Sequence, residues 1–337
     1  MVDTPAFLDS NRPDVPDLVV PRGILPFFLP DRPVRGRVVR LGPLADALLS
    51  RHDNPEPVSR LGGEALAMVA GLASALKFQG SFSLQVKGDG PVGMLLADCT
   101  DAGALRFHAR FDAEKLSALL AQAPEPTARQ LLGDGYLALT VDQGPDTERH
   151  QGIVAIEGGS LSEMAMHYFE NSEQHDCQVR LACALTEGGW RAGALVLERI
   201  AGEGGILQPP ELDNIVNGSA VRPDPDAPGA AAGLGDPDGW QEALVLARTL
   251  SDAELLDDAL PAEQLLFRLF HENGVAADRP RALAYGCRCS RARLAGILET
   301  FPPDDLDHMD VGGDIVMRCE FCNVDFRFPR DSVHGAS

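Results

Sequence analysis

The stretches YGCRCSRAR (285–293) and MRCEFCNVDF (317–326) place two close pairs of cysteines near the end of the chain. Together they hold four of the seven cysteines of the protein. Such clustering has three possible explanations: a disulfide staple, a dithiol redox motif or a metal site. The two pairs are Cys287-x-Cys289 and Cys319-x-x-Cys322.

The spacing of the pairs favours a metal site. Two close pairs on separate segments suit a tetrahedral ion such as zinc, because each pair supplies two thiolates. A disulfide across Cys287-x-Cys289 would be strained, and a thioredoxin-like enzyme needs only one Cys-x-x-Cys, at a helix N-terminus in a βαβ pattern. Neither cysteine segment has that context. We therefore expect one zinc ion per chain, bound by Cys287, Cys289, Cys319 and Cys322.

Composition narrows the class of protein and of partner. The chain has 337 residues, of which 45% are hydrophobic and 23% charged, as in soluble globular proteins with more than one domain. Its formal net charge of −21 argues against a nucleic-acid partner, because the phosphate backbone attracts a basic surface. No lysine follows a glycine, so the phosphate-binding loop G-x-x-x-x-G-K-[ST] is absent.

The chain also lacks the usual signals for export or membrane insertion. Its N-terminal segment has no basic region followed by an apolar core, and so does not resemble a signal peptide. No apolar run is long enough to span a bilayer. We therefore expect a cytoplasmic protein with no membrane partner. Cysteines are usually reduced in that compartment, which argues against a disulfide staple.

The sequence pattern predicts an α+β fold in five parts. Alternating runs bounded by turn residues predict a mostly antiparallel sheet, and the apolar segment 62–78 predicts a buried helix packed on it. Ser160 with Glu163, and Ser251 with Glu254, have the spacing of helix capping boxes. The predicted parts are a flexible N-terminal arm (1–33), a core domain (34–201), a flexible insertion (202–239), a helical linker (240–282) and a small zinc-binding domain (283–332).

The helical linker needs a surface to pack on, because short isolated helices are marginal in water. It lies between a loose insertion and a metal-dependent domain, so its docking is expected to depend on the metal. We expect loss of zinc to release these helices and expose their apolar faces. The apolar residues at helical spacing include Leu244, Leu246, Leu255, Leu265, Phe267 and Phe270.

One glycine-rich segment imitates a nucleotide-binding motif. GDGPVG (88–93) matches G-x-G-x-x-G after a predicted strand. A dinucleotide site needs a helix next, whose N-terminus receives the pyrophosphate. The following segment, MLLADCT (94–100), has the pattern of a strand. We therefore predict a tight hairpin turn here.

The remaining cysteines and two nearby histidines are expected to be structural. Cys99, Cys177 and Cys183 fall in apolar, strand-like runs, where cysteine behaves as a small hydrophobic residue. His271 is predicted to be a cation at a helix C-terminus. His308 lies between the cysteine pairs, but four thiolates already complete a tetrahedral shell, so a solvated loop position is predicted for it.

Segments throughout the chain carry a resemblance to a known family. CRC (287–289) and CEFCNVDFRF (319–328), with further segments of the core domain in the same order, resemble the heat-shock protein thirty-three family of redox-regulated bacterial holdase chaperones. The resemblance covers about Arg35 to Phe328, and departs from the family at the N-terminal arm and near 203–238. The core segments are LKFQG (76–80), GDGP (88–91), GDGYLALT (133–140), RHQGIVAIEG (149–158) and HYFENSEQ (167–174).

The resemblance implies a redox switch rather than an enzyme, with no catalytic residues. The reduced form would bind zinc and be inactive. Oxidation would form the disulfides Cys287–Cys289 and Cys319–Cys322, release zinc and unfold the zinc-binding domain and the linker. The exposed surface would then hold unfolding client proteins without ATP. The active form in this family is typically a homodimer.

Two other classes of function remain open from the residues alone. One is a thiol-disulfide oxidoreductase or isomerase that uses the same cysteines. The other is a static zinc module that serves protein–protein assembly. Zinc retention without turnover of a disulfide substrate would exclude the first, and an activity that responds to peroxide would exclude the second.

Overall fold

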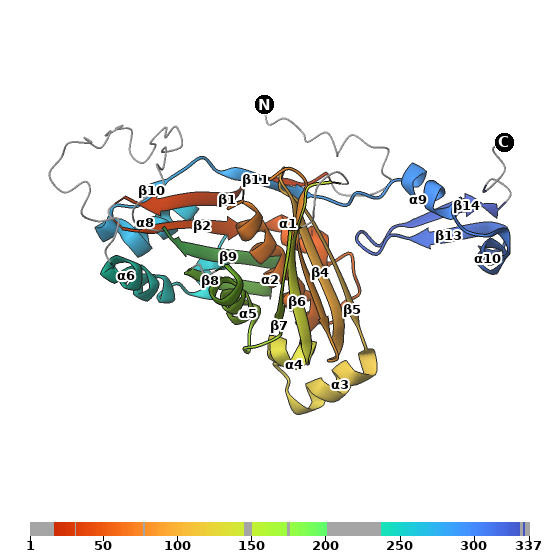
Figure 1. Cartoon of the computed structure of the whole chain (residues 1–337), viewed down its shortest axis with the longest axis horizontal. Coiled ribbons are helices and arrows are strands. Elements are labelled where there is room, and N and C mark those ends of the chain that lie inside the picture. The colour runs from red at the N-terminus through yellow and green to blue at the C-terminus, as the bar shows by residue number, and fades with distance from the viewer. Residues whose placement is uncertain are drawn as a thin grey trace.

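The computed structural model shows an α+β protein built on one large, bent sheet (Figure 1). It describes residues 17–30, 32–76, 78–144, 150–173, 176–200, 237–330 and 333. The sheet is mostly antiparallel, helices pack on it, and a small three-stranded sheet forms near the C-terminus. The predicted fold class is therefore confirmed. Within these ranges, no helix combines the length and the apolarity that a bilayer crossing requires.

The large sheet contains both early and late segments of the chain. Its strands are β1 (Val19–Leu29), β2 (Val34–Arg40), β3 (Ser81–Gly88), β4 (Val92–Thr100), β5 (Ala104–Phe111), β6 (Gly135–Asp142), β7 (His150–Ala155), β8 (Cys177–Thr186), β9 (Gly189–Arg199), β10 (Ala276–Ala277) and β11 (Arg281–Tyr285). In the described ranges the order is β7-β6-β3-β4-β5-β11-β1-β2-β9-β8, with β10 paired to β1. Neighbouring strands run antiparallel, except β11 and β5, which run parallel.

Strands β3 and β4 form the hairpin that the glycine-rich segment predicted. Phe82 pairs with Cys99, and the pairing continues to Lys87 and Met94, beside the turn at residues 89–91. A Cβ atom on Gly90 would lie 2.6 Å from the carbonyl oxygen of Leu131. Glycine is therefore required by the close approach of another segment to this turn, and not by a nucleotide.

Helix α2 (Glu56–Ala73) is the buried helix predicted from the apolar segment. It lies inside the bend of the sheet and packs against β4, β5, β8 and β9. Its glycines let the strands approach: a Cβ atom on Gly62 would lie 2.4 Å from the ring of Phe107, and one on Gly63 would lie 2.3 Å from Sγ of Cys183. The other helices of this half are α1 (Pro43–Leu49), α3 (Ala113–Gln122), α4 (Ala128–Leu132) and α5 (Leu161–Tyr168), which continues as a π-helical turn (Phe169–Glu173). The predicted capping box at the start of α5 is present.

The prediction of an N-terminal arm over residues 1–33 is wrong for the part that is described. Strand β1 lies inside the large sheet, between β11 and β2. Its prolines suggested a loose segment, but the pairing with β11 shifts register between Val20 and Ile24, next to Pro21. Such an irregularity accommodates a residue that cannot donate a ladder hydrogen bond. Residues 1–16 lie outside the described residues.

Three helices cover the face of β1, β2 and β9 that points away from α2. They are α6 (Pro237–Arg248), α7 (Asp252–Leu256) and α8 (Ala262–Phe270). As predicted, Leu255, Leu265 and Phe270 are buried, and the ring of Phe270 stacks on that of Phe27 with centroids 5.6 Å apart. The expectation for Phe267 is wrong: its residue surface is 59% exposed, because it lies on the solvent side of α8.

The chain returns to the large sheet after α8 and a short 3-10 turn (His271–Asn273). Strands β10 and β11 run antiparallel along β1, where a helical linker was predicted over 240–282. A strand forms here because the edge of β1 and the start of β5 offer it backbone partners on both sides. Residues 202–236 of the predicted insertion (202–239) lie outside the described residues.

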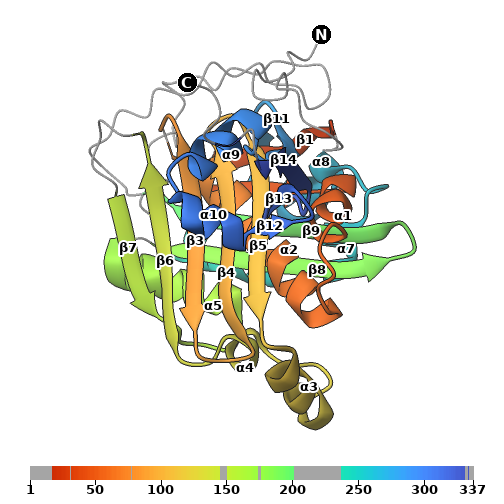
Figure 2. The same ribbon diagram turned by 90° about the vertical axis from the view of Figure 1, so that its right-hand side faces the viewer.

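Residues 286–330, here called the cysteine module, follow β11. Figure 2 shows the module lying over the face of β4 and β5 that points away from α2. It consists of helices α9 (Arg291–Leu298) and α10 (Pro303–His308) and a three-stranded antiparallel sheet of β12 (Asp310–Val311), β13 (Asp314–Arg318) and β14 (Asp325–Pro329).

The outer helices allow a direct test of the packing. We expect F270A to lower the free energy of unfolding by about 3–5 kcal/mol, because it removes a fully buried ring from the contact with Phe27. The matched change F267A removes an exposed ring from the same helix and should cost less than about 1 kcal/mol. Urea titration followed by circular dichroism measures both values. Equal losses in the two variants would contradict the packing described here.

Candidate metal centre

The first cysteine pair is held against the large sheet. Cys287 and Cys289 lie between β11 and α9. The N–H of Gly286 donates a hydrogen bond to the carbonyl oxygen of Leu105 on β5, with 2.7 Å between nitrogen and oxygen. A Cβ atom on Gly286 would lie 2.6 Å from the carbonyl carbon of Ala104. Glycine thus allows the chain to reach β5 just before the first sulfur.

The second cysteine pair lies in the tight turn between β13 and β14. The N–H of Asn323 donates to the carbonyl oxygen of Cys319 at 2.8 Å, and the N–H of Cys319 donates to that of Val324 at 3.0 Å. Asn323 has a φ of 55°, in the left-handed region that asparagine tolerates better than most residues. The turn brings the sulfurs of Cys319 and Cys322 to the same side.

The structure brings all four predicted ligand sulfurs into one buried cluster. The cysteines are free, and their Sγ atoms lie within 4.8 Å of one another. The Sγ–Sγ distances are 3.3 Å for Cys287–Cys289, 3.6 Å for Cys287–Cys319 and 3.4 Å for Cys289–Cys322. Sulfurs at the corners of a tetrahedron, each about 2.3 Å from zinc, lie about 3.8 Å from one another. The donor set and its spacing therefore fit a tetrahedral metal ion.

The four thiols share their protons. Hydrogen bonds with neighbouring thiols lower the pKa of Cys319, chiefly the bond with Cys287, and lower the pKa of Cys287, chiefly the bond with Cys289. The same contacts raise the pKa of Cys289 and Cys322. Thiolates are the form that binds a metal, and these contacts favour that form at Cys287 and Cys319 but disfavour it at Cys289 and Cys322.

The turn of the second pair docks on strand β5. The guanidinium of Arg106 lies over the ring of Phe321, 4.2 Å from its centroid, in a cation–π contact. His108 faces the same ring, and its Nδ1 lies 3.0 Å from the carbonyl oxygen of Glu320. The carboxylate of Glu320 also forms an ion pair with Arg110. Alternate residues of one strand thus bind the turn.

Arg51, just after α1, binds the other side of the same turn. Its Nη1 donates to the carbonyl oxygen of Cys322 at 3.1 Å, and its own carbonyl oxygen accepts from Nδ2 of Asn323 at 2.9 Å. Its guanidinium lies 5.7 Å from the ring centroid of Tyr285, at the end of β11. One arginine therefore contacts the turn of the second pair and the strand that precedes the first.

A buried carboxylate ties the first pair to the core. Asp98 on β4 has a side chain only 5% exposed, and it pairs with Arg106 on β5 at 3.2 Å and with Arg288 at 2.5 Å. Arg288 is the residue between Cys287 and Cys289. The position of the Cys-x-Cys segment is therefore coupled by a charged contact to the middle of the large sheet.

The other cysteines and histidines lie outside the cluster. Cys99, Cys177 and Cys183 are in strands β4 and β8, as predicted, and burial raises the pKa of each thiol, that of Cys177 to about 12. His271 lies at the C-terminus of α8, which is the predicted position. His308 ends α10 and is exposed, so the prediction of solvation is confirmed while that of a loop is wrong.

The sequence did not identify the residues that dock the module. Asp98 and Arg288 are 190 positions apart, and nothing local to either predicts their contact. Arg51 and Phe321 likewise belong to segments with no motif that links them. The one available signal was an arginine inside the Cys-x-Cys segment, but its partner depends on the fold.

The contact of Asp98 with Arg288 generates a prediction. We expect D98N to loosen the module, at a cost of about 1.5–3 kcal/mol in docking free energy, because it removes the charge that two guanidinium groups share. Hydrogen exchange should become faster over residues 286–322. The matched change D307N breaks the more exposed pair of Asp307 with Arg330 inside the module and should have little effect. Equal exchange in the two variants would contradict the coupling.

Comparisons with known proteins agree with this architecture. A family model described as Hsp33 protein matches residues 23–329. A 33 kDa chaperonin of Caulobacter vibrioides is 37% identical over 302 residues, which cover 88% of this chain and 91% of that protein. A 33 kDa chaperonin of Pseudomonas aeruginosa is 33% identical over 309 residues, which cover 91% of each chain.

A solved structure shows the same fold. The crystal structure of a 33 kDa chaperonin (heat shock protein 33 homolog) from Thermotoga maritima matches with a TM-score of 0.68. The match covers 93% of this chain and 97% of that one, at 17% sequence identity, and so bears on the fold alone. The family match along most of its length, together with the identity to the relatives, shows that the chain belongs to the Hsp33 family.

Proposed function

We propose that this protein is a redox-regulated, ATP-independent holdase chaperone whose reduced form binds one zinc ion. Membership of the Hsp33 family supports a chaperone role, and relatives carry the name 33 kDa chaperonin. The zinc site and the redox regulation are supported by the cluster of four free, buried sulfurs at near-tetrahedral spacing. The proposed ligands are Cys287, Cys289, Cys319 and Cys322.

The proposed switch exchanges metal ligation for two disulfides. Each disulfide, Cys287–Cys289 and Cys319–Cys322, forms when two thiolates lose two electrons to one hydrogen peroxide. The O–O bond of the peroxide breaks, and with two protons from solvent it leaves as two water molecules. The sulfurs then no longer bind zinc, because the ligating form is the thiolate. No catalytic residue is needed, and burial of all four sulfurs disfavours an oxidoreductase that must reach a protein disulfide.

The energetics favour unfolding of the cysteine module on oxidation. Structural zinc contributes about 10–16 kcal/mol of folding free energy in small zinc peptides. A disulfide that closes a loop of three or four residues contributes only about 2 kcal/mol by chain entropy. Oxidation therefore replaces a large stabilisation with a small one.

Release of the module is proposed to spread into the linker, residues 240–282. Strand β11 leads directly into Cys287, and the same stretch of chain connects back to α8. Loss of β11 pairing would free α6 to α8 from β1, β2 and β9 and expose apolar faces such as that of Phe270. These faces are proposed to bind unfolding client proteins, and to drive homodimer formation in the oxidised state. The proposed location is the cytoplasm, where the resting state is reduced.

Metal analysis tests the first part of the proposal. We expect one zinc per reduced chain and severe loss of zinc in C319S, because three thiolates do not complete the shell. The matched control C183S replaces an equally buried cysteine of β8 and should retain one zinc per chain. A reduced chain with no zinc, or with two ions, would contradict the site.

An aggregation assay tests the second part. We expect peroxide-oxidised protein to suppress the aggregation of a thermally unfolding model enzyme without ATP, and reduced protein to do so far less. Addition of dithiothreitol and zinc should reverse the gain. Equal activity of both forms would indicate a static zinc module, and absence of activity in both would contradict the holdase proposal.

A further inference from the structure

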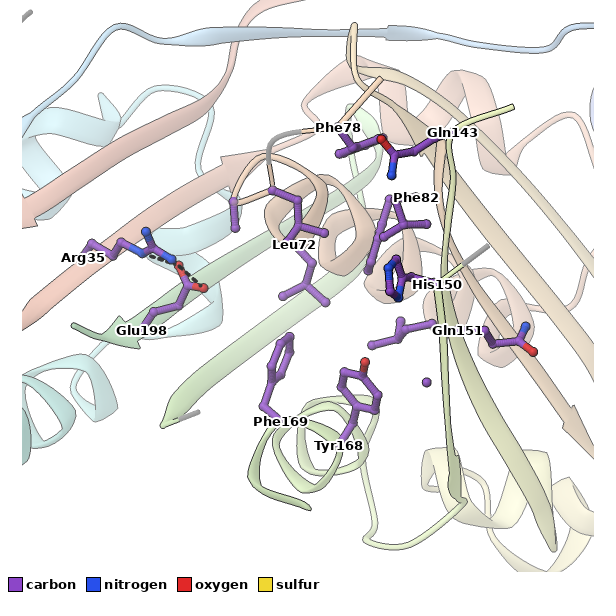
Figure 3. A pocket seen from close by; sticks show the side chains of 15 residues that line it. Arg35, Leu72, Phe78, Phe82, Gln143, His150, Gln151, Tyr168, Phe169 and Glu198 are labelled. Carbon is purple, nitrogen blue, oxygen red and sulfur yellow. Dashed lines mark hydrogen bonds and ion pairs between the residues drawn. The ribbon is translucent and has the colours of Figure 1, made fainter. Parts of the chain in front are cut away.

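A large cavity lies on the opposite side of the sheet from the cysteine module. Phe82 on β3 lines the cavity. On the next two strands, the side chains of Asp98 (β4) and Arg106 (β5) point to the other face of the sheet and contact the module. The cavity has a volume of about 760 Å³, within the usual range for ligand sites. It opens between β6 and β7 on one side and β2 and β9 on the other, above the C-terminal end of α2 (Figure 3).

The floor and walls of the cavity are largely aromatic and aliphatic. Figure 3 shows Tyr168 and Phe169 pointing into it from the end of α5, opposite Phe82 and Phe78. Four of the five core segments that carry the family resemblance supply wall residues: 76–80, 133–140, 149–158 and 167–174. The proposed redox switch uses none of these segments. The apolar lining residues are Leu72, Ala75, Leu76, Phe78, Phe82, Leu139, Val141, Tyr168 and Phe169.

One end of the cavity carries excess positive charge. Glu198 on β9 accepts from two arginines of β2: Nε of Arg35 at 2.9 Å and Nη1 of Arg37 at 2.5 Å. These two guanidinium groups carry one positive charge more than the single carboxylate that they share. The side chains of Arg37 and Glu198 are only 8% and 7% exposed, but that of Arg35 is 44% exposed and lines the cavity. This end therefore favours an incoming carboxylate.

The opposite wall is the edge of the large sheet. Strand β7 is last in the strand order and pairs with β6 alone among the described strands. Its residues His150, Gln151 and Gly152 line the cavity. An edge strand offers backbone N–H and C=O groups at regular spacing, which an extended polypeptide can pair with. A fatty acid or other single-chain amphiphile would leave these groups unused.

We propose that this cavity binds an extended segment of unfolded polypeptide, with apolar or aromatic side chains on its floor and an acidic residue at the Arg35 end. The segment would add to the edge of β7. This proposal rests on the proposed chaperone function and specifies its client chemistry. Because the cavity is formed while the four cysteines are free and lies away from the module, we expect a short peptide to bind the reduced chain, whereas holding a whole client still requires the switch.

Fluorescence anisotropy of a fluorescein-labelled peptide, Glu-Leu-Phe-Ile-Phe-Gly-Ser, with the reduced full-length chain tests this. We expect saturable binding that weakens about tenfold in R35Q and in F169A. R35Q should fold, because Glu198 keeps its bond to Arg37. The matched control R199Q removes an arginine of β9 that pairs with Asp176 and does not line the cavity; its affinity should equal that of the wild type.

A double-mutant cycle isolates the charged contact. Replacing the glutamate of the peptide with glutamine should weaken binding to the wild type about tenfold and should not weaken binding to R35Q further. Non-saturable binding, equal affinities of R35Q and R199Q, or binding of dodecanoate at this site without binding of the peptide would each overturn the proposal. The aggregation assay remains independent: its failure would refute the holdase function, whereas peptide binding to reduced protein would stand.

Discussion

Strand β11 joins the two halves of the large sheet. It pairs antiparallel with β1 on one side and parallel with β5 on the other, and the strand order runs through it. The parallel contact has only two aligned residue pairs, Ala284 with Ala104 and Tyr285 with Leu105. The next residues are Gly286 and Cys287. A change in the position of the sulfur cluster therefore acts directly on the short β11–β5 contact, because only Gly286 lies between Tyr285 and Cys287.

The contact between module and core combines a few directional bonds with polar atoms that lack partners. Nε2 of His52, Nε of Arg106 and the hydroxyl of Tyr285 are buried and have no hydrogen-bond partner among the described residues. Burial also lowers the pKa of His52 and raises that of Tyr285. An unpaired buried polar group costs about 1–3 kcal/mol, which hydration recovers when the surfaces separate. Separation of the module from the core would therefore hydrate these atoms, while it breaks the contacts of Phe321 and Arg288.

Local sequence patterns predicted several elements of the fold and the clustering of the four cysteine sulfurs. These features depend on residues that are close in sequence. The capping boxes, the buried helix α2 and the β3–β4 hairpin are of this kind. Strand β1 was missed because its prolines disrupt any alternating pattern, and its pairing with β2, β10 and β11 makes it a strand. The pair of Asp98 with Arg288 and the cavity at Arg35 were missed because the fold, and no local motif, assembles them.

The place of β11 in the sheet has a consequence for synthesis on the ribosome. About 250 residues separate the end of β1 from Arg281, so at roughly 5–20 residues per second the edge of β1 waits on the order of 10–50 s for its partner. During that time β1 presents unpaired backbone and apolar side chains such as Ile24 and Phe27. β2 follows within a few residues and covers one edge, but the other stays open. The nascent chain thus passes through the aggregation-prone state that the finished protein is proposed to recognise in others.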